Sequence, residues 1–470
     1  MMAAFLITAG TQNLYAQTAS EETGKDNKDN EQSESSKDEE EEEKSTKQDD
    51  SENTWIFEGY ARLGHRLRYT REYSDVTEED QDASGILSLL VSDREKKPRF
   101  SLNLLANFNL DTDGNPYKGS GPYRDAYYSD SGNLTARLYS AYIESHQNNC
   151  KFFVGRQAIY RGESLDFDGL RAECRIGDNL NVSAYGGIPS NFWESSHEGD
   201  HFAGGGLEFG LSKVLSLRGD YIHIRDKMTY ESGEPVARDN LMIFTGKYIR
   251  LKPLIVDCLY SSVNGEQRRA MLRVKLLDKK KGLLLSASML RQNVALTQYS
   301  TEISPYYVVL AEYAPYYRYR FLALKTLGKH VEVETGVDIR KLLDREEEGM
   351  LNHSYERYYG GIHLKKLLGK KLDFTLMAER WNATGRSDKT ALEGYVKYAA
   401  SKKLVFRVGS DFSRYLYDYN FNEEKENIYS TFVRCDYSFS RTASLRLKYS
   451  LNRDNREDYN VIEAYLILNW

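Results

Sequence analysis

The fold of this chain is decided by its last twelve residues, YNVIEAYLILNW (459–470). Every second position of this stretch belongs to one apolar face, formed by Ile462, Ala464, Leu466, Leu468 and Trp470. The other face also carries polar side chains, among them Glu463 and Asn469. Because side chains alternate between the two faces of a strand, this pattern predicts a strand with one side in an apolar environment.

A soluble domain rarely ends on a strand that is apolar along one whole face and finishes on Trp. The last strand of a bacterial outer-membrane β-barrel does, because it must close the cylinder while facing lipid. The ending resembles the C-terminal signature of that class. We therefore expect Tyr459–Trp470 to pair with the first strand, Thr54–Tyr69, and Trp470 to lie at the periplasmic interface.

The composition agrees with a barrel and excludes a helical membrane protein. The 470 residues have a mean hydropathy of −0.64 and contain no apolar run of about 18 residues, which a membrane-spanning helix needs. A barrel that alternates lipid-facing and lumen-facing residues looks hydrophilic on average. The 36 Tyr and 18 Phe, against 8 Pro, suit the aromatic girdles of such a barrel.

Segments of period two alternate with short and long connectors from residue 54 onward. Short connectors such as Gly177–Asn179 and Ser401–Lys403 take turns with longer polar ones such as 190–200 and 342–354. This asymmetry is typical of short periplasmic turns and longer extracellular loops. We predict an all-β, transmembrane, antiparallel up-and-down barrel over 54–470, with about 22 strands (range 18–26) and both termini in the periplasm.

Two segments precede the barrel. Residues 1–16 predict a secretory signal peptide, with an apolar core at Ala3–Gly10 and a cleavage site after Ala16. Residues 17–53 carry 15 acidic and 5 basic side chains, which leaves about +4 for the barrel within the total of −6. Such a segment is expected to be disordered. It is a solvated periplasmic linker, a docking arm for a cationic periplasmic partner, or an electrostatic plug for its own pore.

Charged side chains share single faces of the predicted strands. In Phe100–Leu110 and Ala270–Leu276, one face is apolar and the other is polar or basic. A charge on the lipid side at mid-bilayer costs about 2–4 kcal/mol, so the charged faces should look into the lumen. The pore-lining candidates are Arg62, Arg66, Arg68, Arg171, Arg218, Arg269, Arg273, Glu332, Glu334, Asp338, Arg407, Arg434 and Arg446.

These charges have two interpretations. They form a ladder that selects solutes, as rings of side chains do in pores. Alternatively, arginine–carboxylate pairs across neighbouring strands brace a wide cylinder and neutralise each other. The small positive balance favours anionic or zwitterionic solutes.

The stretch Phe153–Pro189 carries a family resemblance. Its segments Gly155-Arg156-Gln157, Asp168-Gly169-Leu170-Arg171 and Tyr185-Gly186-Gly187 resemble the repeating hairpins of outer-membrane porins of the alginate-export and OprD-like type. The resemblance covers about 40 residues and implies a passive diffusion channel. It adds Arg156 to the pore-lining candidates and supports Arg171.

A barrel of about 22 strands must be narrowed, since 16–18 strands already leave an aqueous channel. Among the loops, Asp111–Gly132 is the leading candidate because it is long and rich in Gly, Pro and Tyr. The acidic segment and a partner protein are the other candidates.

Two motifs are discounted. The sequence His197-Glu198-Gly199-Asp200-His201 matches the zinc-protease pattern, but that chemistry needs a helix and this stretch is a polar loop with a glycine. The stretch Asp111–Asn115 lacks the downstream Glu of a calcium loop. With no catalytic constellation and no C-x-x-C-H haem motif, we expect no enzyme activity, no metal and no cofactor.

The four cysteines divide into two pairs. Cys258 and Cys435 fall on predicted lipid faces. Cys150 and Cys174 lie symmetrically about residue 162, the tip of one hairpin, so they should face each other across two strands. We hypothesise a cross-strand disulfide, which the oxidising periplasm permits.

The sequence thus predicts a porin-type channel in the outer membrane of a Gram-negative cell. The alternative is a barrel sheath that holds a periplasmic or multihaem partner. An active transporter that depends on TonB is rejected, because it needs a folded plug of more than a hundred residues. The expected partners are outer-membrane lipid, small hydrophilic solutes and the outer-membrane assembly machinery acting on the C-terminal strand; nucleic acid is not among them.

Overall fold

The structure is a computed structural model. It describes residues 55–72, 77–93, 98–112, 134–160, 164–190, 200–212, 214–227, 236–250, 253–293, 315–344, 346, 354–383, 388–419, 422–453 and 457–470. The predicted signal peptide, the acidic segment and most of the 111–132 loop lie outside the described residues.

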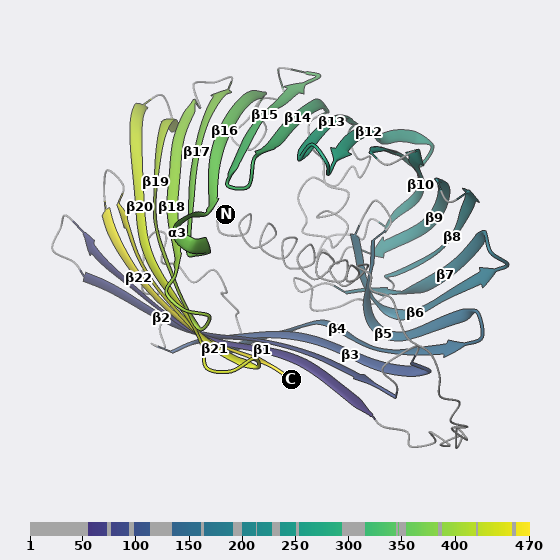
Figure 1. Cartoon of the computed structure of the whole chain (residues 1–470). Coiled ribbons are helices and arrows are strands. Elements are labelled where there is room, and N and C mark those ends of the chain that lie inside the picture. Colours follow the sequence, from purple (N-terminus) through teal and green to yellow (C-terminus); the bar gives the residue numbers. More distant parts are fainter. Residues whose placement is uncertain are drawn as a thin grey trace, which may run out of the picture.

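The chain forms one closed antiparallel sheet of 22 strands, the predicted number (Figure 1). The strands are β1 (Ile56–Glu72), β2 (Thr77–Ser92), β3 (Phe100–Asp111), β4 (Leu134–Gln147), β5 (Cys150–Tyr160), β6 (Ser164–Ile176), β7 (Leu180–Pro189), β8 (His201–Ser212), β9 (Leu215–Lys227), β10 (Val236–Arg250), β11 (Leu254–Val263), β12 (Glu266–Asp278), β13 (Leu283–Gln292), β14 (Tyr316–Leu327), β15 (Val331–Leu342), β16 (Tyr355–Lys366), β17 (Leu372–Ala383), β18 (Lys389–Ala399), β19 (Leu404–Tyr419), β20 (Asn422–Ser438), β21 (Ala443–Arg453) and β22 (Glu457–Asn469). Each strand pairs with its neighbours in sequence, and β1 pairs with β22. The prediction of an up-and-down barrel is confirmed.

The outer wall is apolar, as the period-two pattern predicts. Leu170 on β6, Leu207 on β8 and Phe244 on β10 are 61%, 58% and 54% exposed. Residues of the opposite parity, such as Phe167 and Leu241, are fully buried. An exposed band of large apolar side chains around a closed barrel suits lipid, because every backbone group already has a partner in the sheet.

The barrel closes at the stretch that decided the fold. The backbone N–H of Gly59 donates to the carbonyl of Trp470 at 2.8 Å, and the N–H of Trp470 donates back at 3.0 Å. The Trp470 indole lies over Gly59, since a Cβ at that glycine would come within 2.1 Å of the ring. The expected pairing of the first and last strands is confirmed.

One side of the barrel departs from the predicted pattern of apolar outside and polar inside. A buried apolar cluster spans the inner face of β5 to β11, formed by Ile159, Leu165, Phe167, Tyr185, Phe202, Ile222, Ile224, Leu241, Ile243 and Val263. Phe167 and Phe202 meet edge to face, with ring centroids 4.7 Å apart. These side chains are shielded from solvent, so this sector has a core rather than a water-lined wall.

The connectors also depart from strict alternation of short and long. β11 and β12 are joined by Asn264 and Gly265 alone, at the end of the barrel away from the termini. Both residues have positive φ, 51° and 87°, as the tight Asn-Gly hairpin turn requires. At the end that carries the termini, β16 and β17 are joined through the short helix α3 (Leu367–Lys370).

Candidate functional site

Four cations form a row across four neighbouring strands on the inner wall. The register pairs Lys397 of β18 with Arg407 of β19, Arg407 with Arg434 of β20, and Arg434 with Lys448 of β21. We call these four residues the cation row. Like charges directly opposite each other destabilise a sheet, so this arrangement costs stability.

The row continues with alternating sign on the strands that close the barrel. Lys448 is opposite Glu463 of β22, Glu463 is opposite Arg66 of β1, and Arg66 is opposite Asp82 of β2. Glu463 accepts hydrogen bonds at 3.2 Å from both Arg66 and Lys448. One carboxylate therefore bridges the seam between the two ends of the chain.

The members of the cation row differ in how far nearby carboxylates neutralise their charge. Lys397 lies 3.4 Å from a carboxylate oxygen of Asp373, and Arg434 makes a bidentate pair with Asp436 at 2.7 and 2.9 Å. Arg407 stacks over the Tyr395 ring at 5.2 Å and forms no ion pair within the described part of the chain. Arg407 is therefore the least neutralised cation of the row.

The cation row borders an open recess of about 510 Å³ on the inner wall. Arg66, Arg68, Arg407, Arg434 and Lys448 line it, against the carboxylates Asp411 and Glu463. Hydroxyl and amide groups of Ser430, Ser450 and Asn452 complete the lining. A recess with this excess of cationic donors is chemically suited to a small carboxylate or phosphate.

A second row, on the nearby strands β14 to β16, is balanced instead. Arg320 of β14, Asp338 of β15 and Arg357 of β16 are opposite one another. Arg318 and Arg320 donate to Asp338 at 2.6 and 3.0 Å, and Arg357 pairs with Glu379 at 2.5 Å. Here the bracing interpretation describes the geometry well, because each cation has a carboxylate beside it.

The remaining inner-face candidates are also mostly engaged. Arg68 contacts Asp80 and Asp82, Arg218 contacts Asp220 and Glu208, Arg273 contacts Asp257, Arg446 contacts Asp436, Glu332 contacts Lys365, and Glu334 lies 3.7 Å from His363. Arg62 lies over the Tyr465 ring, Arg171 over the Phe153 ring, and Arg269 donates to Gln292. By strand alternation all of these share the inner face.

Arg156 is the exception, and the candidate is corrected. It shares the parity of Phe152 and Val154, which are 41% and 54% exposed on the outer wall. Its guanidinium makes a bidentate pair with Asp168, at 2.8 and 2.6 Å, and also donates to the carbonyl of Leu138. Arg156 therefore belongs to a neutralised pair outside the barrel and does not line the pore.

Sequence reasoning missed Lys397 and Lys448 as members of the row. Their strand faces could be assigned from alternation, but their alignment with Arg407 and Arg434 depends on the offset between neighbouring strands. The alternation of side chains along a strand tells which face a residue lies on, but it does not determine the offset between neighbouring strands.

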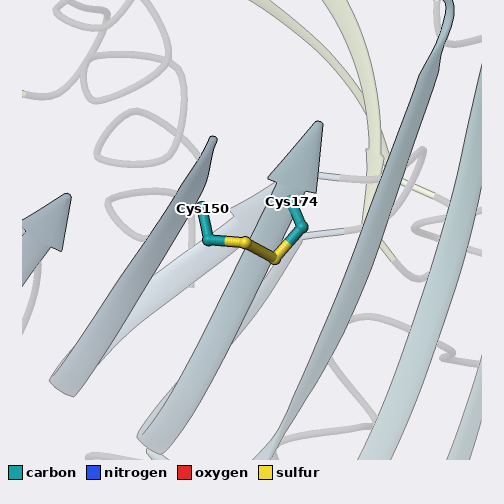
Figure 2. The surroundings of a disulfide bond; sticks show 2 residues. All are labelled: Cys150 and Cys174. Carbon is teal, nitrogen blue, oxygen red and sulfur yellow. A yellow bond between two sulfur atoms is a disulfide. The ribbon is translucent and has the colours of Figure 1, made fainter. Parts of the chain in front are cut away.

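The structure joins Cys150 and Cys174 in a disulfide between β5 and β6 (Figure 2). The two residues are direct partners in the register, near the end of the barrel that carries the termini. Their parity is that of Phe152 and Leu170, so the bond lies on the outer wall.

Other chemistry has little support within the described ranges. No three potential metal-ligating side chains converge there, and no helix described is long and apolar enough to cross a membrane. The first three residues of the His197–His201 motif lie outside the described residues, while His201 is the first residue of β8.

Comparison with known proteins shows that this chain resembles several solved structures in its fold. No protein-family model and no curated protein matches the sequence. The structure is similar to the P pilus usher (PapC) translocation pore, with a TM-score of 0.50 and 10% identity over 88% of this chain and 99% of that one. The structure is also similar to a BenF-like porin from Pseudomonas fluorescens Pf-5, with a TM-score of 0.46 and 11% identity over 88% of this chain and 99% of that one. For Pseudomonas aeruginosa OccK2 (OpdF), the TM-score is 0.41 and the identity is 10%, over 88% of this chain and 98% of that one.

At about 10% identity, these similarities support the fold and say nothing about the solute. The closed 22-stranded sheet and its apolar outer wall are those of a β-barrel that spans an outer membrane.

Proposed function

We propose that the chain is an outer-membrane channel through which small hydrophilic solutes diffuse, and that the cation row makes it prefer anions. The observation that carries this proposal is the row itself. Three successive like-charged pairs, Lys397–Arg407, Arg407–Arg434 and Arg434–Lys448, cost stability that alternating signs would avoid. A pore that must attract anions gives a reason for such a row.

The geometry around the row supports passage rather than tight binding. The recess is open to the lumen, and its donors come from several strands, so an anion can move from Arg407 toward Lys448 along a track of similar sites. Conduction needs binding that is favourable enough for entry and weak enough for release. The neighbouring carboxylates Asp436 and Glu463 moderate the positive potential of the track.

The size of the barrel supports a channel as well. Twenty-two strands spaced about 4.8 Å apart and tilted about 40° correspond to a circle roughly 44 Å across between backbones. The buried cluster on β5 to β11 occupies one side, which leaves the wall near β18 to β22 and β1 for solutes.

The test is single-channel recording of the purified barrel in planar bilayers, with a salt gradient to measure the reversal potential. We expect discrete conductance steps and a reversal potential that indicates anion preference. Cation preference would refute the role of the cation row. Absence of conductance, together with a protein that co-purifies in stoichiometric amount, would refute the channel and favour the alternative of a sheath around a partner.

A further inference from the structure

One end of the barrel is densely basic. We call this end the terminal rim, because β1 begins there and β22 ends there; in its described part it comprises turns such as 279–282, 328–330, 366–371, 400–403 and 439–442. The exposed cations of these turns include Lys279, Lys280, Lys366, Lys371, Lys402 and Lys403. None of these six forms an ion pair with another residue in the described ranges.

Backbone hydrogen bonds join these turns into a continuous edge. The N–H of Ser438 donates to the carbonyl of Lys403, and that of Ala399 to the carbonyl of Lys371. The N–H of Asn469 reaches Thr442 in the same way. The basic turns are thus neighbours on one surface, and this surface includes the closing strand.

Three acidic side chains of the terminal rim accept hydrogen bonds from the backbone of its turns. Asp93 accepts the backbone N–H groups of Arg99 and Phe100, Asp278 accepts that of Lys281, and Asp373 accepts that of Lys366. These carboxylates fix the backbone of the turns, and the six exposed lysines outnumber them.

The described part of the opposite end carries charges of both signs, because Lys341, Arg380 and Lys389 lie at the same strand ends as its carboxylates. Its described residues next to the strand ends include Asp200, Asp344, Glu346 and Asp388. The exposed lysines of the described turns therefore make the terminal rim the more attractive end for an anionic chain.

Residues 17–53 are such a chain, and they are joined to the terminal rim. Their 15 acidic and 5 basic side chains include the run Glu39–Glu43, and residue 53 lies only three residues before β1. A flexible coil of 37 residues would have a root-mean-square span of roughly 35 Å, comparable with the barrel mouth. A tether of this length gives an effective concentration in the millimolar range.

We propose that residues 17–53 dock on the terminal rim of their own barrel, with the acidic run Glu39–Glu43 lying against rim lysines such as Lys279, Lys280, Lys402 and Lys403. The contact is electrostatic, multivalent and dependent on ionic strength. It neutralises rim cations that otherwise draw anions toward this end of the barrel. The occupant is a segment of this chain because it has the complementary charge and is held at the same edge.

The test uses zero-length carbodiimide cross-linking, which joins a carboxylate to a lysine amine in direct contact. The full chain in phosphatidylcholine nanodiscs at 50 mM NaCl should give cross-linked peptides between residues 31–52 and the rim lysines. These peptides should be lost at 1 M NaCl. Cross-links to a lysine farther along the inner wall, such as Lys448, would overturn docking on the rim and indicate a plug. No cross-links at low salt would refute the proposal outright.

A matched variant separates charge from tethering. Replacing the acidic side chains of 17–53 by Asn and Gln keeps the length and should leave the rim lysines as open to acetylation as they are in a chain without the segment. With the native segment, acetylation of Lys279, Lys280, Lys402 and Lys403 should fall, while acetylation of Lys448 stays constant.

Anionic lipid is the competing occupant of a basic surface next to a bilayer. If phosphatidylglycerol in the nanodisc abolishes the cross-links and protects the rim lysines in the presence and the absence of residues 17–53, the rim binds lipid and the proposal fails. The proposal does not depend on the solute that passes the barrel. A barrel that conducts no ions can still give the cross-links, and an anion channel can lack them.

Discussion

Replacing Arg407 by Gln tests the cation row at its least neutralised member. An anion about 6 Å from the guanidinium in a water-filled lumen gains roughly 0.7 kcal/mol, and screening at 0.1 M salt reduces this to about 0.4 kcal/mol. Loss of that term lowers anion occupancy about twofold and raises cation occupancy about twofold. The anion-to-cation permeability ratio should therefore fall about fourfold.

The assay is the reversal potential across planar bilayers at 0.1 M and 1 M salt. At 1 M the Debye length is about 3 Å, so the same substitution should change the ratio by less than about twofold. Arg156→Gln is the matched control, because it removes the same charge from the outer wall and should leave the ratio unchanged. An unchanged ratio in Arg407→Gln, or an equal fall in both variants, would refute the reasoning.

Stability gives a second, independent measure of the same variant. Arg407 lies opposite Lys397 and Arg434, so its removal relieves repulsion of about 0.2–1 kcal/mol for each pair. The midpoint of urea unfolding in detergent should stay constant or rise. A brace would behave in the opposite way, and a fall in the midpoint would show that Arg407 supports the wall.

Three further substitutions test the wall and its seam. Asp338→Asn should destabilise the barrel by about 2 kcal/mol in urea unfolding, because Arg318 and Arg320 both lose their carboxylate; an unchanged midpoint would contradict that pairing. Gly59→Leu should cost about 1–3 kcal/mol and shift the Trp470 fluorescence, since the indole occupies the space above that glycine; a native spectrum would show that the ring lies elsewhere. Non-reducing mass spectrometry should recover Cys150 and Cys174 in one linked peptide, and Cys150→Ser should lower stability by about 3 kcal/mol, as expected for a bond that spans 24 residues; two free thiols in the native protein would rule the bond out.

The fold could be predicted from the sequence because a barrel repeats one simple rule. Most strands alternate apolar and polar residues, and each connector breaks the alternation, so about 22 segments can be counted without knowledge of their contacts. The closing strand was recognisable from Tyr459–Trp470 alone. Lipid imposes this pattern on every strand, which makes the signal cumulative even where single strands are weak.

The inner apolar cluster was not predicted, because alternation only separates the two faces of a strand. The inner face was then assumed to be polar. Ile222 and Ile224 share a face of β9, and Leu241 and Ile243 share a face of β10. Both faces of these strands carry apolar side chains, since Tyr221 and Met242 are exposed on the outer wall. A strand that is apolar on both sides is the signal for a sector with its own core.

Arg156 shows the opposite kind of error. Its own strand places it with Phe152 and Val154, on the apolar side. The family resemblance suggested the lumen, and the periodicity of β5 would have given the correct face. Local alternation was the stronger evidence because it comes from the strand that positions the side chain.

The hydrogen bond between Arg66 and Glu463 joins residues 397 positions apart in the chain. Every other strand pairing links neighbours in sequence and can form as a hairpin, so this seam alone requires both ends of the polypeptide to meet. The entropy lost in bringing such distant segments together is recovered only once all the intervening strands are ordered. We therefore expect the seam to form last, and until it does the first and last strands present open hydrogen-bonding edges that can pair with other chains. During biogenesis, closure of the barrel therefore competes with pairing of the open strand edges to another polypeptide.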